Sequence, residues 1–225
     1  MTVKTPRKSK SQQRRILLVD DHAIVREGFA EIINNKPDLQ VCGQSSTASR
    51  ALEAVSRLRP DLVVVDLSLQ GGSGLELIKQ IRAVHPHVPM LVLSMHDEAL
   101  YAERCLRAGA LGYVMKQEEA ETVMQAVHSV LRGEVHVSEA IRGRMLNTLV
   151  GRQLARDQTG IPRLSDREIE VFQLMGEGRT TRQIAQKLRL SLSTIETHRA
   201  HIKEKLNLRN AAELMRAAVE WATRR

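Results

Sequence analysis

The sequence predicts an α/β protein: a doubly wound, five-stranded parallel sheet, followed by a second, smaller all-α domain. Short apolar runs alternate with amphipathic stretches in the first half of the chain, which is the pattern of strands alternating with helices. The last quarter shows closely spaced helical patterns instead. A length of 225 residues suits two domains, and a hydrophobic content of 42% is enough for compact cores.

The strands are expected near residues 16–20, 40–44, 62–66, 89–94 and 111–115, with helices between and after them. Apolar residues at helical spacing mark the face that each helix turns to the core. On the first helix these are Ile24, Val25, Phe29, Ile32 and Ile33, and on the helix after the last strand Val123, Val127, Val130 and Leu131. Cys42 and Cys105 lack metal-ligand spacing and are expected to be reduced packing residues.

The charge is unevenly distributed along the chain. Residues 1–15 carry +6, residues 16–131 carry −5 and residues 132–225 carry +7, which sum to the net +8. We expect a basic disordered tail (1–14), the α/β domain (15–132), a linker with a short helix (133–161) and a helical domain (162–225). Only the basic helical domain is expected to bind a polyanion. The alternative to a disordered tail is an arm that binds nucleic acid. No run of about 18 apolar residues is present, so we expect a cytoplasmic protein without a membrane span.

Polar residues stand at the ends of four of the predicted strands. These residues are Asp20, Asp21, Asp66, Ser94 and Lys116. Parallel strands bring their carboxyl ends to one edge, where open α/β sheets bind ligands. Each residue alone reads more simply as a helix cap, a turn residue or a solvated charge. The five together, in this order, favour a functional pocket.

Three carboxylates in one pocket require a cation to remain ionised together. Oxygen ligands without a Cys or His cluster favour Mg²⁺, which commonly takes carboxylates and phosphate oxygens. Lys116 and Ser94 would then face the oxygens of a transferred phosphoryl group, and Asp66, at the centre, is the expected nucleophile.

These residues resemble the receiver domain of bacterial two-component response regulators, over about residues 15–132. The resemblance implies that Asp66 accepts phosphate from a sensor histidine kinase and that Ser94, Lys116 and Tyr113 complete the switch. It implies Mg²⁺ ligands at Asp20, Asp21, Asp66 and the backbone carbonyl of Ser68. One departure is Gln70, where the family usually has proline, so we expect a looser loop and altered kinase recognition with the ligand set intact.

The segment after Pro162 contains four helical patterns. In the first, Ser165 is followed three positions later by Glu168, which predicts a capping box. A second helix is followed by a short turn at 189–191 and a third helix over 192–206. Such a helix, turn and helix lays its second helix in the major groove of DNA.

This segment resembles the LuxR-type helix-turn-helix over about residues 162–219. The matching residues are Leu164-Ser165-Asp166-Arg167-Glu168, Gly178, Ile184-Ala185, Ser191, Thr194, Ile195 and His198. The resemblance implies that the bases are faced by Glu196, Thr197 and Ala200, and that the candidates for the DNA backbone are Thr194, Arg199 and Lys203. Many members of the family have lysine where this chain has Glu196. A carboxylate there cannot bind phosphate, and we expect it to accept a hydrogen bond from a cytosine amino group.

A receiver followed by this module resembles the NarL/FixJ class of response regulators. We therefore expect a transcription regulator, not an enzyme, that binds double-stranded DNA and forms a homodimer when phosphorylated. In the last helix, Leu214, Ala218 and Trp221 fit a dimer contact and packing within the domain equally well. Two alternatives remain: a Mg²⁺-dependent enzyme with an aspartyl-phosphate intermediate, which needs a substrate pocket or cap that is not evident, and a receiver-like regulator that binds DNA without phosphorylation control.

Overall fold

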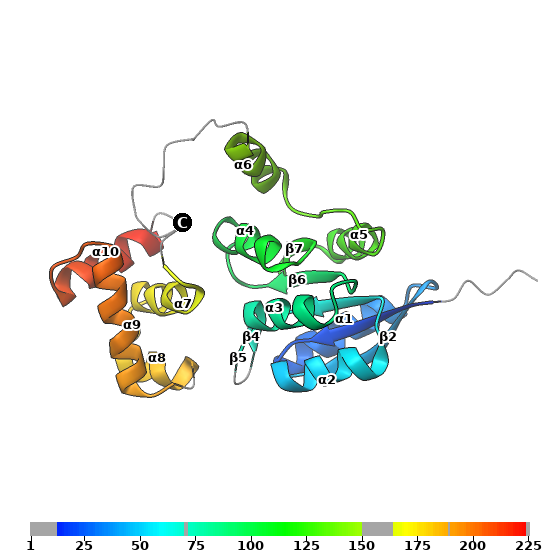
Figure 1. Ribbon diagram of the computed structural model, residues 1–225, viewed down its shortest axis with the longest axis horizontal. Helices are drawn as coiled ribbons and strands as arrows, with labels where there is room; N and C mark the ends of the chain where they lie inside the picture. The colour runs from blue at the N-terminus through cyan, green and yellow to red at the C-terminus, as the bar shows by residue number, and fades with distance from the viewer. Residues whose placement is uncertain (1–12, 70–71, 150–163, 189, 224–225) are drawn as a thin grey trace, which may run out of the picture. The chain divides into compact units, whose positions relative to one another are not determined.

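The computed structural model describes residues 13–69, 72–149, 164–188 and 190–223, in two units that divide at residues 150 and 151 (Figure 1). The expected tail of residues 1–14 therefore lies outside the described residues except for its last two, and Arg14 already opens the first strand. No helix within these ranges is both long enough and apolar enough to cross a membrane.

The first unit contains the predicted parallel sheet, so the predicted fold class is confirmed. Its strands are β1 (Arg14–Val19), β2 (Leu39–Ser45), β3 (Leu62–Val65), β6 (Met90–Ser94) and β7 (Gly112–Met115). They pair in the order β2-β1-β3-β6-β7, and every pairing is parallel. Because this order reverses direction after β1, the carboxyl ends of β1 and β3 lie side by side, which is where doubly wound sheets bind ligands.

Helices cover both faces of the sheet. They are α1 (Ala23–Asn34), α2 (Ala48–Leu58), α3 (Gly74–Val84), α4 (Glu98–Ala108) and α5 (Ala120–Leu131). Helices α1 and α5 share one core with alternate residues of the strands. Ile33 of α1 and Val127 of α5 belong to this core, and so do the strand residues Leu18, Val64 and Leu93. The strand residues between these, such as Leu17 and Val63, are also fully buried, which is why the strands read as continuous apolar runs.

The predicted inward face of α1 is wrong at its first residue. Ile24 is 85% exposed, whereas Ala30 and Ile33 are buried and Phe29 and Ile32 are partly buried. At 3.6 residues per turn, Ile24 lies about 180° around the helix from Ile33. The face that packs on the sheet is therefore set by Ala30 and Ile33, and Ile24 points away from it.

The segment after α5 packs on the first unit. His136 pairs with the edge strand β7, because its N–H donates to the Leu111 carbonyl (2.9 Å) and its carbonyl accepts from Tyr113 N–H (2.9 Å). The following helix α6 (Glu139–Leu149) contacts α4 and buries Ile141. The predicted linker (133–161) is therefore folded against the sheet up to α6, and its residues 150–161 lie outside the described part.

A two-stranded hairpin that the sequence did not predict follows β3. It pairs β4 (Ser68–Leu69) with β5 (Gly72–Ser73) in antiparallel register, and α3 begins directly after it. A Cβ atom at Gly74 would lie 2.0 Å from the carbonyl oxygen of Asp66, so only glycine allows α3 to start this close to the strand end. Gln70, the departure from the receiver pattern, lies outside the described residues.

The second unit consists of α7 (Asp166–Gly176), α8 (Thr181–Leu188), α9 (Leu192–Lys205) and α10 (Ala211–Thr223). The predicted capping box is present: Ser165 Oγ accepts from Glu168 N–H, and Glu168 Oε2 accepts from Ser165 N–H (2.6 Å). Helix α9 begins with a second cap, in which Ser191 Oγ accepts from Thr194 N–H (3.0 Å). These local caps fix where the two helices start.

Helix α10 closes the core of the second unit. Leu214 and Ala218 are fully buried, and the Trp221 ring lies 5.4 Å from the Phe172 ring of α7. A Cβ at Gly176 would lie 2.5 Å from the Ala218 carbonyl, so glycine permits the close crossing of α7 and α10. Leu214, Ala218 and Trp221 had two possible roles, a dimer contact or packing within the domain. In this structure they pack within the domain.

Candidate functional site

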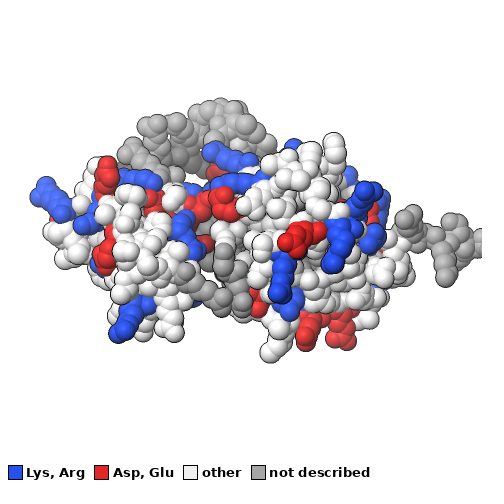
Figure 2. Space-filling view, turned by 60° about the horizontal axis from the view of Figure 1, so that its bottom comes forward, with Lys and Arg blue, Asp and Glu red and all other residues white. Residues whose placement is uncertain are grey.

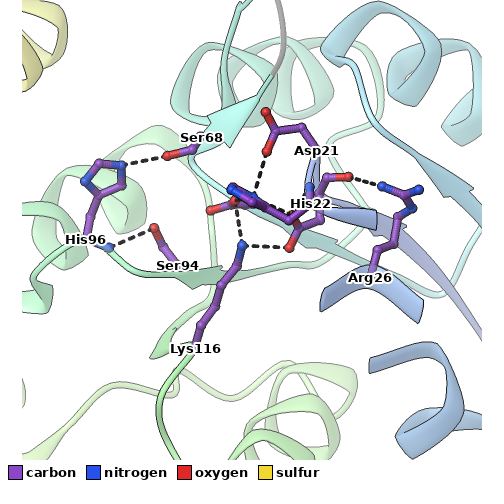
Figure 3. A network of polar contacts seen from close by, with 9 residues as sticks. Asp21, His22, Arg26, Ser68, Ser94, His96 and Lys116 are labelled. Atoms are coloured by element: carbon purple, nitrogen blue, oxygen red, sulfur yellow. Dashed lines mark hydrogen bonds and ion pairs between the residues drawn. The ribbon is translucent and has the colours of Figure 1, made fainter. Parts of the chain in front are cut away.

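The polar residues at the strand ends meet at one edge of the sheet. Asp20 and Asp21 follow β1, Asp66 follows β3, Ser94 ends β6 and Lys116 follows β7. Lys116 Nζ lies 2.7 Å from Asp20 Oδ2 and 2.6 Å from Asp66 Oδ2, so one ammonium bridges two carboxylates (Figure 3). Lys116 N–H also donates to the Ser94 carbonyl (2.9 Å), which aligns the ends of β6 and β7.

Asp66 is the most deeply placed of the carboxylates. Asp66 is 3% exposed, and its Oδ1 atom is buried without a hydrogen-bond partner among the described residues. Burial raises the pKa of the Asp66 carboxyl and the neighbouring Asp20 adds to the rise, while the Lys116 ammonium opposes it. A desolvated carboxylate with one bound and one unpaired oxygen has an electron pair available for a ligand or an electrophile.

The acidic residues fit a hard divalent cation. Ligand atoms of Asp20, Asp21, Asp66 and His22 all lie within 4.8 Å of one another. Three carboxylates in such a space, two of them with a buried oxygen that accepts no hydrogen bond among the described residues, form the oxygen donor set that Mg²⁺ prefers. The predicted fourth ligand, the carbonyl of Ser68, belongs to the hairpin strand that begins two residues after Asp66.

Two residues that the sequence reading left out border the acidic cluster. His22 Nδ1 lies 2.9 Å from Asp21 Oδ1 and 3.3 Å from Asp20 Oδ1, on a different side of the cluster from Lys116 (Figure 3). Arg26, in the first turn of α1, donates to the Asp20 carbonyl (2.6 Å). The sequence offered a signal for His22, because it directly follows two aspartates. It offered none for Arg26, whose contact with Asp20 depends on how α1 leaves the sheet.

A third residue, His96, connects the pocket to the predicted switch tyrosine. Its N–H donates to Ser94 Oγ (3.2 Å) and its Nε2 lies 3.0 Å from Ser68 Oγ. Its carbonyl accepts from Tyr113 Oη (2.7 Å). Tyr113 is 1% exposed, and burial raises its pKa. The ring of the predicted switch residue is thus already buried in this structure.

The second candidate site is the face of α9. Glu196, Thr197 and Ala200 are exposed on it, and Thr194 and Lys203 are partly exposed. The Arg199 side chain is only 19% exposed, and its Nη1 donates to Thr181 Oγ1 of α8 (2.6 Å) and pairs with Glu196 Oε1 (2.9 Å). All six predicted DNA contacts are therefore accessible in part or in full, and Arg199 turns toward α8.

Lys205, at the end of α9, has a different environment from an exposed basic residue. Its Nζ lies 2.6 Å from Glu168 Oε2 and 2.9 Å from Oε1, and Glu168 itself is 2% exposed. Burial acts to raise the pKa of Glu168, but hydrogen bonds from Lys205 and from Ser165 lower it by more. Lys205 therefore fastens α9 to α7.

The surface charges in view give no single-sign patch. Figure 2 shows Lys and Arg interspersed with Asp and Glu over the visible face of each unit. The charge distribution on the visible surface therefore does not by itself indicate DNA binding. The evidence for that candidate function is the set of particular side chains on α9, together with the net positive charge of the C-terminal segment.

Comparisons with known proteins bear on both units. Residues 16–128 match the response regulator receiver domain family, and residues 162–218 match the luxR family of bacterial regulatory proteins. The chain is 35% identical over 210 residues to the oxygen regulatory protein NreC of Staphylococcus haemolyticus (strain JCSC1435), covering 92% of this chain and 97% of that protein.

Two solved structures are similar to this chain, one over part of its length and one over most of it. A LuxR-family two-component response regulator from Aurantimonas sp. SI85-9A1 is 34% identical, with a TM-score of 0.57, and covers 62% of this chain and 99% of its own. RcsB from Salmonella enterica serovar Typhimurium, bound to promoter rprA in the presence of phosphomimetic BeF3-, is 25% identical with a TM-score of 0.62. That match covers 92% of this chain and 99% of RcsB.

Proposed function

Because this chain belongs to the response regulators of the NarL/FixJ class, which join a receiver domain to a LuxR-type DNA-binding domain, we propose that phosphorylation of Asp66 switches its binding to double-stranded DNA. The phosphoryl donor in this proposal is a partner sensor histidine kinase. The observation that carries the proposal is the buried Asp66 carboxylate, which is held at Oδ2 by Lys116 and unpaired at Oδ1.

The chemistry at Asp66 is a phosphoryl transfer. A carboxylate oxygen of Asp66 forms a bond to phosphorus while the bond from phosphorus to the histidine nitrogen of the kinase breaks, and the electron pair of that bond remains on the nitrogen. Mg²⁺ held by Asp20, Asp21 and Asp66 would neutralise charge on the phosphoryl oxygens. The Lys116 ammonium, already 2.6 Å from Asp66, is placed to bind one such oxygen, and the Ser94 hydroxyl to bind another.

The signal leaves the pocket through the end of β6. Ser94 Oγ currently accepts from His96 N–H, and the His96 carbonyl accepts from Tyr113. A phosphoryl group that takes the Ser94 hydroxyl as a partner changes the first of these contacts and thereby the loop that anchors Tyr113. The surface of α4 and β7 around that ring then has two arrangements, of which phosphorylation favours one.

The DNA-binding step is assigned to α9. Thr197 and Ala200 lie on its exposed face, suited to base edges, and Lys203 is suited to a phosphate. The similarity to RcsB, whose structure contains promoter DNA, supports this role. Phosphorylated protein is proposed to bind as a homodimer, and α10 leaves Met215 and Val219 exposed for such a contact. The proposal is for a cytoplasmic regulator and not for an enzyme.

A regulator that binds DNA without phosphorylation control is the second candidate. It is favoured by Tyr113, which already occupies the inward position with its hydroxyl bound to the His96 carbonyl. If this inward arrangement is the active one, the unphosphorylated protein would already bind DNA fully.

The deciding experiment compares DNA binding and oligomeric state with and without beryllofluoride plus Mg²⁺, in the wild type and in Asp66→Ala. We expect dimerisation and tighter DNA binding in the presence of beryllofluoride, and neither effect in Asp66→Ala. Identical DNA binding in all four conditions would overturn the switch and establish the constitutive regulator.

A further inference from the structure

The recognition helix α9 carries an exposed carboxylate that is held in place by two neighbours. Glu196 Oε1 accepts from Thr181 Oγ1 (3.1 Å) and from Arg199 Nη1 (2.9 Å), and Arg199 Nη1 also donates to Thr181 Oγ1 (2.6 Å). Thr181 is the first residue of α8, whereas Glu196 and Arg199 stand one turn apart on α9. The three side chains therefore form a closed set that ties the carboxylate to both helices.

Arg199 faces this set instead of solvent. Its side chain is 19% exposed, and its Nε is buried with no hydrogen-bond partner in the described part of the chain. The Glu196 side chain, by contrast, is 58% exposed. A guanidinium in this position has little access to a DNA phosphate, and its charge acts mainly on Glu196.

The pairing changes what a carboxylate can do near DNA. An isolated carboxylate on a recognition helix is repelled by the phosphates on both sides of the groove. An arginine at hydrogen-bond distance offsets this repulsion and fixes the side-chain rotamer. Both hydrogen bonds that Glu196 accepts end on Oε1, so Oε2 has no hydrogen-bond partner among the described residues.

An acceptor without a donor selects bases by their amino groups. In the major groove, cytosine presents its N4 amino group as a donor, and acidic side chains pair with it, whereas guanine presents the acceptors N7 and O6. We propose that Glu196 selects cytosine in the bound DNA by accepting a hydrogen bond from N4, and that Arg199 and Thr181 are positioning residues for it. This inference rests on the proposed DNA-binding function.

The test is selection of binding sites from random duplex DNA by the full-length protein, followed by affinity measurements on single-base variants of the selected site. The variants are Glu196→Gln and a matched control, Glu204→Gln, which removes one exposed carboxylate from the same helix. We expect the wild type to prefer cytosine at one position per half-site by about ten-fold. Glu196→Gln should move that preference to adenine, because glutamine pairs with adenine N6 and N7, and Glu204→Gln should leave it unchanged.

The positioning role is tested with Arg199→Ala and Thr181→Val. Both should reduce the ratio of affinities for cytosine over the other bases at that position, with Arg199→Ala the larger reduction. A purely structural role would lower affinity for all sites alike and leave this ratio unmoved. Trp221 fluorescence identifies any variant that has lost the fold, and Thr181→Val, which is close in shape, keeps the test open if Arg199→Ala unfolds.

The outcomes separate the two proposals. A wild type that binds no duplex DNA, with or without beryllofluoride, overturns the proposed function and this inference with it. A wild type that binds a specific site whose base preference is the same in Glu196→Gln overturns the inference alone. A shift confined to one base position in Glu196→Gln, absent in Glu204→Gln, supports it.

Discussion

Both units of this protein bury a carboxylate beside a lysine, yet the pKa of the carboxyl group shifts in opposite directions in the two pairs. Asp66 and Lys116 are 2.6 Å apart in the first unit, as are Glu168 and Lys205 in the second. Both carboxylates are nearly inaccessible, at 3% and 2% exposure. Burial raises the pKa of Asp66, whereas the pKa of Glu168 is lowered because its hydrogen bonds outweigh its burial.

The difference lies in how completely each carboxylate is paired. Both oxygens of Glu168 accept hydrogen bonds, from Lys205 and from Ser165, and no second acid lies beside it among the groups that shift its pKa. Asp66 has an unpaired buried oxygen and shares its lysine with Asp20. A buried carboxylate whose oxygens are both paired can contribute to the stability of the fold. A buried carboxylate that is only partly paired and lies beside another acid lowers that stability, but its free oxygen is available for chemistry.

The largest effect that tests this contrast is on phosphorylation. Asp66→Asn should abolish phosphoprotein formation from acetyl phosphate and Mg²⁺, because the amide is not a nucleophile. Glu168→Gln should leave it unchanged, and Asp38→Asn serves as a control for an exposed aspartate of the first unit. Incorporation of radiolabelled phosphate measures each yield, and labelling that persists in Asp66→Asn would place the acceptor elsewhere.

In the second unit, removing either partner of the buried pair should reduce stability, by unequal amounts. Lys205→Met leaves a buried carboxylate short of partners and should cost about 3 kcal/mol. Glu168→Gln should cost only about 1–2 kcal/mol, because the freed lysine can regain water. Urea unfolding followed by Trp221 fluorescence reports on this unit, since Trp221 is the single tryptophan and packs on Phe172. Lys203→Met is the control, and equal effects of the two pair variants would contradict the asymmetry.

The same pair predicts a pH dependence with a definite sign. The folded state lowers the pKa of Glu168 from its ordinary 4.5, so its contribution to stability is complete above that value and is lost as the pH falls through the lowered pKa. The stability difference between wild type and Glu168→Gln should therefore shrink from about 1–2 kcal/mol at neutral pH toward zero in acid. Urea midpoints measured from neutral to acid pH check this, and a constant difference would argue that charge is not its source.

The smallest expected effect has the opposite sign in the first unit. Asp66→Asn should raise the stability of the receiver by up to about 1 kcal/mol, because it removes a desolvated charge that Asp20 repels. The near-ultraviolet circular dichroism of Tyr101 and Tyr113, the only tyrosines, follows unfolding of this unit. A clear loss of stability in Asp66→Asn would mean that the Asp66–Lys116 pair is structural, like its counterpart in the second unit.

Much of the site was predictable because the end of a strand can be recognised from a few consecutive residues, and in a parallel sheet it fixes which residues share an edge. Apolar runs locate the strands, and parallel pairing places Asp20, Asp66 and Lys116 at one edge, whatever the details of packing. The hairpin at Ser68 and the location of His96 were missed. Both depend on how the loops after β3 and β6 fold over each other, which no short-range pattern records.

Sequence alone determined the fold class, the strand ends and the cap at Ser165, because strand period, helix period and capping geometry are properties of a few consecutive residues. Only the tertiary structure decided which way Ile24 faces, that residues after α5 pair with β7, and that Arg199 turns toward Thr181. These outcomes depend on the rotation and close packing of whole elements. The same holds for the pair of Glu168 and Lys205, 37 positions apart, whose contact exists only once α7 and α9 have packed together.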